Sequence, residues 1–390
     1  MRNASWLKLT LAAACVVLLA VVASACGGSS SDSTTSAEST TTESADTGES
    51  GSADYIAAAK EKVAPVVGQP TAFPVTEKLK ELPKGATVAF MDCGLPYCAL
   101  FWELLQEPAE LMGINLERIK SGEDASTISN AFDSVVAQKP AGVIVMANNI
   151  QLWLTQLKEL QEEDVAVVTQ GIIEAEKYGV ISPRSAEKQN LFIGEMMANY
   201  VPAYMNPEAN VVVYEVPELS FTTELAKSFV AAVKNSCPKC TARVAQIPAA
   251  SIGTKSSNEI VSDLQAHPDT NLAIFPNPEL SVGLPSSLQA AGLEIESISN
   301  GPVPGNLQQI KEGTETAGFG VDTAVTSWLL IDQVARLIAH QKLSGPEAEG
   351  LTDYQFLSKE DITFDPEQGW TGYPDYADRF AKLWGVEAPG

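Results

Sequence analysis

Four cysteines that follow the N-terminal region are the residues best suited to chemistry, and they occur as two close pairs. Cys93 lies near Cys98, and Cys237 with Cys240 forms a Cys-X-X-Cys motif. Four cysteines allow three pairings, and sequence proximity favours the two local ones. A Cys-X-X-Cys motif can also be a redox centre or half of a zinc site. No second such motif occurs and the chain has only 2 histidines, so we expect structural disulfides and no bound metal.

Catalytic signatures are missing from the sequence. It contains no Gly-X-Ser-X-Gly, no His-Glu-X-X-His and no glycine-rich phosphate loop of the usual spacing. The two histidines, His267 and His340, fall at the ends of predicted helices. We therefore expect no enzyme activity, no catalytic residue and no cofactor, with an exported hydrolase as a remote alternative.

Residues 1–25 have the features of a signal peptide. Arg2 and Lys8 supply positive charge, and an apolar run of about 14 residues follows, which is shorter than the roughly 20 residues that cross a membrane. The small residues 23–25 before Cys26 resemble the lipobox of bacterial lipoproteins, which implies lipidation of Cys26. An ordinary secretory signal cut after Ala25 is the alternative.

Residues 26–53 predict a flexible tether behind that lipid anchor. After Cys26 they consist almost wholly of Gly, Ser, Thr, Ala, Asp and Glu, which cannot bury enough apolar surface to fold. An N-terminal extension, 54–83, separates the tether from the periodic part of the chain. These segments place the protein outside the cytoplasm, lipid-anchored to the cell membrane.

The charge of the chain excludes several kinds of partner. The formal net charge is -24. Removal of residues 1–25 deletes two positive charges and no acidic ones, so the charge of the remainder is -26. Nucleic acid and anionic lipid would be repelled, so we expect no nucleic-acid partner, and we expect a monomer.

Short β-rich segments alternate with helical patterns from residue 84 onward. This alternation predicts an α/β fold with parallel sheets that helices cover on both faces. A first series has expected strands at 86–91, 114–119, 142–146 and 165–169, and a second has them at 210–216, 242–246, 271–275, 293–298 and 316–319.

Three stretches, 86–170, Ala266-His267-Pro268-Asp269 and 271–283, resemble the type 1 periplasmic binding proteins, in the ribose-binding-like branch that serves ABC importers. The resemblance implies two doubly wound parallel-sheet lobes joined by a three-crossover hinge. The expected division is 84–172 plus 302–341 for lobe 1, and 173–301 plus 342–390 for lobe 2 and a hinge-spanning C-terminal segment.

The same resemblance implies an extracytoplasmic solute-binding protein. Its lobes would close on a small-molecule ligand and deliver it to an ABC permease. A ligand-sensing module for a membrane receptor is the alternative, since it would have the same fold and the same pocket.

The likeness extends to positions that contact ligand in sugar-binding members. Ligands of open parallel sheets bind beyond the carboxyl ends of the strands. Where sugar-binding members carry an aromatic residue that stacks on the ligand, this sequence has Tyr97. Where they carry four charged residues that bind the sugar, it has Gly171, Ile172, Thr223 and Asn300. Each polar group left unpaired on closure costs about 1–3 kcal/mol, so we expect a ligand less polar than a simple sugar.

Two carboxylates, Asp92 and Asp322, are expected at the mouth of the pocket. If one of them faced the ligand unpaired it would favour an amine, whereas Asp322 could instead cap the helix that begins at Thr323. The complete set of expected ligand-binding residues is Asp92, Tyr97, Trp102, Asn148, Gln170, Gly171, Phe221, Thr223, Asn277, Asn300 and Asp322.

Overall fold

The computed structural model describes residues 47–122, 124–180, 186–343 and 354–389. The expected signal peptide, the lipidated Cys26 and most of the tether lie outside these ranges. Residues 47–53, the last of the expected tether, belong to helix α1 (Thr47–Val63), so the boundary expected after residue 53 falls inside a helix. Over the described ranges, no helix combines the length and the apolar character needed to cross a membrane.

The first lobe is built on a four-stranded sheet in the order β2-β1-β3-β4. All neighbouring strands in it are parallel, as expected when each strand is followed by a helix. Its elements are β1 (Thr87–Asp92), α2 (Pro96–Met112), β2 (Asn115–Lys120), α3 (Ala125–Gln138), β3 (Gly142–Met146), α4 (Leu154–Glu162) and β4 (Ala166–Gln170).

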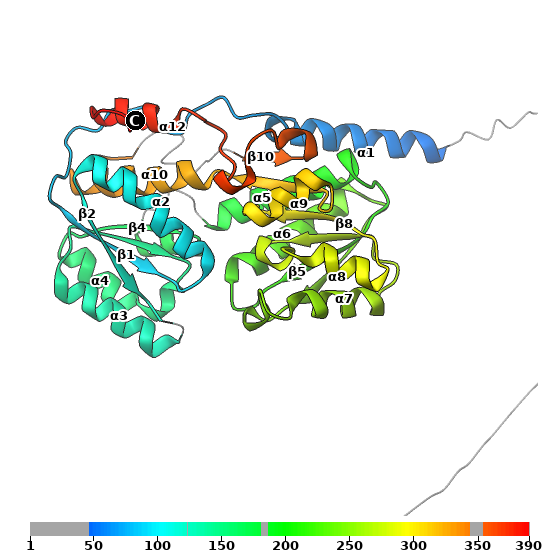
Figure 1. The fold of residues 1–390 in the computed structure, drawn as a ribbon, viewed down its shortest axis with the longest axis horizontal. Coiled ribbons are helices and arrows are strands. Elements are labelled where there is room, and N and C mark those ends of the chain that lie inside the picture. Colours follow the sequence, from blue (N-terminus) through cyan, green and yellow to red (C-terminus); the bar gives the residue numbers. More distant parts are fainter. Residues whose placement is uncertain (1–46, 123, 181–185, 344–353, 390) are drawn as a thin grey trace, which may run out of the picture. The chain divides into compact units, whose positions relative to one another are not determined.

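Alternate residues of these strands face two different apolar layers. In β1, Val88 and Phe90 pack with α2 and with a later helix, α10 (Thr323–Ile338), whereas Ala89 and Met91 pack with α3 and α4. Figure 1 shows the sheet with helices on both sides. Strands β1, β3 and β4 are buried on both faces, which explains their nearly continuous apolar sequences, whereas the edge strand β2 is largely exposed and mostly polar.

The second lobe is built on a six-stranded sheet in the order β10-β9-β8-β7-β5-β6. Its strands are parallel except β10, which pairs antiparallel with β9. The elements are α5 (Ala186–Tyr204), β5 (Asn210–Glu215), α6 (Ser220–Ser236), β6 (Thr241–Gln246), α7 (Ser256–Ala266), β7 (Leu272–Phe275), α8 (Leu284–Ala291), β8 (Glu296–Asn300), α9 (Pro304–Glu312), β9 (Ala317–Val321) and β10 (Tyr354–Leu357).

Helices α1, α5 and α6 cover one face of this sheet, and α7 and α8 cover the other. α5 and α6 approach closely at Gly194, where an added Cβ would lie 2.6 Å from the Ser228 side chain. A larger residue at position 194 would therefore force the two helices apart.

The expected division of the lobes is wrong for part of 302–341. Strand β9 pairs with β8, with Ala317 opposite Ile298, so 302–321 belong with the second sheet. Helix α10 packs in the first lobe, and the chain therefore changes lobes at Asp322. The order of elements along the chain does not reveal which sheet a strand joins, and this is why the boundary was misplaced.

Both terminal segments contribute to both lobes. At the N-terminal end α1 packs against the second lobe, while Val75 and Leu79 pack in the core of the first. At the C-terminal end β10 extends the second sheet and α12 (Tyr376–Trp384) packs in the first lobe. The two segments also meet directly, since the Leu79 amide donates to the Leu383 carbonyl at 3.0 Å.

Seven short 3-10 helices complete the described elements. They are η1 (Ala64–Val66), η2 (Ile150–Leu152), η3 (Ala175–Tyr178), η4 (Ala249–Ser251), η5 (Pro278–Leu280), η6 (Lys359–Asp361) and η7 (Pro366–Gln368).

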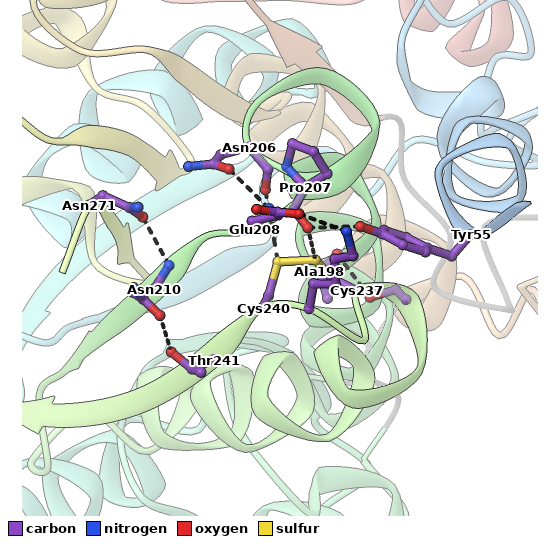
Figure 2. Close-up of a disulfide and its surroundings, with 12 residues drawn as sticks. Tyr55, Ala198, Asn206, Pro207, Glu208, Asn210, Cys237, Cys240, Thr241 and Asn271 are labelled. Carbon is purple, nitrogen blue, oxygen red and sulfur yellow. Dashed lines mark hydrogen bonds and ion pairs between the residues drawn. A yellow bond between two sulfur atoms is a disulfide. The ribbon is translucent and has the colours of Figure 1, made fainter. Parts of the chain in front are cut away.

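The two local disulfides expected from the sequence, Cys93–Cys98 and Cys237–Cys240, are confirmed. Cys237–Cys240 closes the turn between α6 and β6, next to the loop before β5 (Figure 2). In that loop the Pro207 carbonyl accepts a hydrogen bond from the Tyr55 hydroxyl of α1 at 2.9 Å. This disulfide therefore stiffens the place where α1 is attached.

Candidate functional site

A cavity of about 110 Å³ is lined by residues from both lobes. Five strands contribute residues at their carboxyl ends, and the N-terminal parts of α2, α5, α6 and α9 complete the lining. This is the position at which open α/β sheets bind ligands, and the volume suits a small molecule. The strand-end residues in the lining are Met146, Ala147, Gln170, Gly171, Pro276, Asn277, Asn300, Gly301 and Val321.

The loop after β1 brings a disulfide and an aromatic ring to this cavity. Cys93, Cys98 and Tyr97 all line it. The Tyr97 ring packs edge to face on Phe101, with centroids 4.9 Å apart, and Phe101 is fully buried. The disulfide ties the loop to the first turn of α2, so Tyr97 is held by a cross-link on one side and the core on the other.

Three buried polar atoms in the lining have no hydrogen-bond partner among the residues that the structure describes. They are Gln170 Oε1, Asn190 Nδ2 and Asn300 Oδ1. The Asn300 amide is oriented by its Nδ2, which donates to the Pro276 carbonyl at 3.3 Å. Buried polar groups are nearly always paired with protein or water. These atoms are therefore available to a bound molecule or to ordered water.

Glu279 supplies a carboxylate to the lining. It lies on η5, where its backbone amide donates to Asn277 Oδ1 at 3.1 Å. Burial raises the pKa of the Glu279 carboxyl, and the Asn277 side chain opposes this in part through a hydrogen bond. Among the described lining residues there is no Lys, Arg or His, so this carboxylate has no cation beside it in the described lining.

Six of the expected ligand-binding residues line the cavity together. They come from α2, β4, α6 and β8 and from the residues that follow β4 and β7, and they include two of the three expected aromatic contacts, Tyr97 and Phe221. The six are Tyr97, Gln170, Gly171, Phe221, Asn277 and Asn300.

The two carboxylates expected at the mouth are engaged elsewhere. Asp92 is 2% exposed and forms an ion pair with Arg118 at 2.8 Å. Asp322 caps α10 by accepting from the Val325 amide at 2.9 Å, which was the alternative considered for it. Its other oxygen accepts from Thr371 Oγ1 at 2.8 Å, so neither carboxylate is an unpaired group facing the cavity.

Three further expected residues are outside the described lining. Trp102 packs near Phe90, with centroids 5.9 Å apart, and lies beneath the Arg118 guanidinium. Asn148 is buried, and its Oδ1 accepts from Ser121 Oγ at 3.1 Å. Thr223 is on α6 two residues beyond Phe221, which faces the cavity.

Several lining residues were not expected from the sequence. Those on α5 carry no motif, and Glu279 lies between the expected strand at 271–275 and the expected helix at 280–291, where only Asn277 was singled out. Position after a strand end, the rule that identified Asn277, could have extended to Pro276 and Ala147. The remaining lining residues are Leu95, Met146, Gln189, Asn190, Ile193, Leu219, Pro278, Glu279, Gly301, Val303 and Val321.

Metal ligands do not gather anywhere in the described ranges, where no group of three or more His, Cys, Asp or Glu could hold an ion.

Comparison with known proteins gives a family match and structural matches. Residues 86–342 match the family model described as periplasmic binding protein domain. A search of curated protein sequences gives no significant match.

Three solved structures illustrate the likeness in fold. One is a 5-methylthioribose transporter solute-binding protein from Thermotoga lettingae, with 17% identity, a TM-score of 0.64, and coverage of 78% of this chain and 99% of that one. Another is an ABC transporter solute-binding protein from Agrobacterium vitis with bound allitol, with 16% identity, a TM-score of 0.60, and coverage of 72% of this chain and 97% of that one. The third is an ABC transporter periplasmic solute-binding protein from Actinobacillus succinogenes with bound D-allose, with 14% identity, a TM-score of 0.61, and coverage of 71% of this chain and 99% of that one. They confirm the two-lobed α/β fold.

Proposed function

This chain belongs to the family of periplasmic binding protein domains, and on that basis we propose that it captures a small solute between its lobes and delivers it to an ABC permease. Members of this family bind solutes outside the cytoplasm and do not convert them. The expectation that the chain is not an enzyme agrees with that membership.

The cavity at the strand ends is the observation that carries the proposal. Its lining comes from β3 and β4 of the first lobe and from β7, β8 and β9 of the second. A ligand there contacts both lobes, so it binds more tightly when the lobes are close together than when they are apart. This difference in affinity is the condition for ligand-driven closure. The permease would recognise that arrangement.

We propose that the ligand is less polar than a simple sugar. Most of the lining residues are aliphatic, aromatic, proline or glycine, and two of the places where sugar-binding members would carry charged residues hold Gly171 and Asn300. One structural neighbour carries 5-methylthioribose in its structure, and a methylthio group makes one end of such a sugar apolar. A molecule with a polar end for Gln170 and Asn300 and an apolar end for Tyr97 and Phe221 suits this cavity.

We also propose that residues 1–25 are a signal peptide and that Cys26 is a lipid anchor. The basis is the order of charge, apolar run, small residues and cysteine. Mass spectrometry of the membrane-extracted protein would test this. A diacylglyceryl adduct on Cys26 is expected, and an unmodified N-terminus at that residue would contradict the anchor while leaving export intact.

A thermal-shift screen of the purified protein tests the binding function. The compounds should include sugars, polyols, methylthio sugars, amino acids, nucleosides and aromatic amides. A ligand at 100 times its dissociation constant stabilises the folded state by about 2.7 kcal/mol, which is a clear rise in melting temperature. A tight simple hexose would contradict only the polarity argument, whereas no small-molecule ligand at all would contradict the function.

A further inference from the structure

The electrostatics of the cavity narrow the class of ligand. Glu279 is the carboxylate in the lining, and the described lining residues include no Lys, Arg or His. The turn that carries Glu279 is fixed by hydrogen bonds. The carbonyl of the neighbouring Pro278 accepts from Asn306 Nδ2 at 3.1 Å and from Ser281 Oγ at 3.1 Å. The carboxylate therefore sits on a fixed turn and not on a free loop.

The other polar groups of the cavity add acceptors more than donors. Gln170 Oε1 and Asn300 Oδ1 are buried acceptors without a partner, against one such donor, Asn190 Nδ2. The orientation of Asn300 is fixed by its hydrogen bond to the Pro276 carbonyl. A carboxylate accepts and never donates. A ligand that presents N–H or O–H donors can therefore satisfy two of these three buried atoms.

The aromatic residues favour positive charge on that ligand. Tyr97 and Phe221 both line the cavity, and the faces of aromatic rings attract ammonium groups, most strongly when these are desolvated. An ammonium group donates three hydrogen bonds and also neutralises a carboxylate. A neutral hydroxyl group can donate to Gln170 and Asn300, but it leaves the charge of Glu279 uncompensated in a cavity from which the ligand displaces water.

We infer that the cavity selects small ligands that carry a protonated amine, which Glu279 receives. This inference rests on the proposed solute-binding function and specifies its substrate class. The expectation that Asp92 and Asp322 are the carboxylates at the mouth is wrong, and the carboxylate in the described lining is Glu279 on the second lobe. The desolvation that raises the pKa of Glu279 is relieved when an ammonium group takes the place of water.

Matched ligand series test the inference by isothermal titration calorimetry. One series is tyramine, tyrosol and 4-hydroxyphenylacetate, and the other is glucosamine, glucose and glucuronate. In the first series the charge changes at the end of one side chain, whereas in the second the amine replaces the hydroxyl at C2 and the carboxylate replaces the hydroxymethyl group at C6. In a series that binds, the amine should bind at least about tenfold more tightly than its neutral partner, since hydrogen bonds between charged groups exceed neutral ones by this order.

Two variants separate Glu279 from the general negative charge of the protein. Glu279→Gln should weaken binding of the amine at least about tenfold, so that the amine no longer binds more tightly than its neutral partner. Glu294→Gln makes the same change of charge at an exposed residue outside the described cavity lining, and should leave the preference intact. Thermal melting of both unliganded variants shows whether they fold.

The outcomes distinguish this inference from the function on which it rests. A neutral or anionic member that binds as tightly as the amine, or a preference that survives in Glu279→Gln, would overturn the inference and leave solute binding in place. Binding of other solutes but of neither amine would overturn it as well. Failure to bind any small molecule would overturn both.

Discussion

The indole of Trp384 in α12 stacks on that of Trp328 in α10, with centroids 5.2 Å apart and planes 10° from parallel. The Trp384 Nε1 also donates to Asp332 Oδ1 at 2.6 Å. A residue six positions from the C-terminus is thus 4% exposed and part of the core of the first lobe. It joins the end of the chain to the helix that follows the lobe change at Asp322.

Replacement of Trp384 by Ala should lower the free energy of unfolding by about 3–5 kcal/mol. The variant loses a buried indole and leaves Asp332 with one hydrogen bond fewer. Urea denaturation followed by circular dichroism measures the change. Lys382→Ala, at an exposed position on the same helix, should change stability by less than about 0.5 kcal/mol. Equal effects of the two changes would contradict the placement of Trp384 in the core.

The stability of the protein should fall as pH rises through neutrality because of Glu315. Burial raises the pKa of this carboxyl from 4.5 to about 7, although its Oε2 accepts from Asn306 Nδ2 at 3.1 Å and Gln309 Nε2 at 3.0 Å. A raised carboxyl pKa means that the folded state holds the proton more tightly than the unfolded chain. The resulting stability is present below pH 4.5 and is lost as pH rises through about 7.

Glu315→Gln should remove this component of the pH dependence. Between pH 5 and pH 8 the unfolding free energy of the wild-type protein should drop relative to the variant by up to about 3 kcal/mol. The comparison cancels the contribution of the other acidic residues, and Glu294→Gln serves as a control for the loss of one charge. Parallel pH profiles for the wild-type protein and Glu315→Gln would show that the buried carboxyl stays ionised.

Removal of the cavity disulfide should weaken ligand binding more than removal of the distant one. In the Cys93→Ala/Cys98→Ala variant the loop that carries Tyr97 loses its cross-link, and ordering it on binding costs free energy. Cys237→Ala/Cys240→Ala is the matched control, because its disulfide is at the α6–β6 turn and outside the described cavity lining.

Both double variants should lose about 2 kcal/mol of stability, as expected for the closure of short loops. We expect only the first to show a reduced affinity, by a factor of about three to ten, in calorimetry with the ligand found by the screen. An unchanged affinity in the first variant would show that core packing on Phe101 holds Tyr97 without the disulfide.

Tyr97→Ala should weaken ligand binding by more than about 1 kcal/mol if the ring stacks on the ligand. Tyr97→Phe keeps the ring and should retain most of the affinity, which separates stacking from the contribution of the hydroxyl. Calorimetry of both variants with the same ligand provides the measurement. Equal affinities of wild-type protein and Tyr97→Ala would remove this residue from the site.

The sequence predicted the class of fold and part of the cavity because both follow from local pattern. Gln170, Asn277 and Asn300 were expected on the rule that ligands lie beyond strand ends, and all three line the cavity. Gly171 has a φ of 69°, a left-handed backbone that suits glycine. This conformation fits the glycine found where sugar-binding relatives carry a charged residue.

The alternation of strand and helix patterns in the sequence could not predict contacts between distant parts of the chain. The sequence around Asp92 shows a strand end, but only the parallel pairing of β1 with β2 places Arg118 beside it. No expectation was stated for Glu279 from the sequence, and the turn that carries it is fixed by a contact between distant parts of the chain, in which Asn306 of α9 donates to the Pro278 carbonyl. The lobe to which β9 belongs was likewise fixed by pairing and not by order along the chain.

The Asp322 junction couples the cavity mechanically to the C-terminal segment. Val321 lines the cavity, and the next residue, Asp322, holds Thr371 Oγ1 and the Gly372 amide at 2.8 Å each. A change in backbone torsion at this junction must either move residues 371 and 372 as well or break these two hydrogen bonds. The C-terminal segment is therefore tied to the residue that follows Val321 of the cavity lining, and a shift of either one is transmitted to the other.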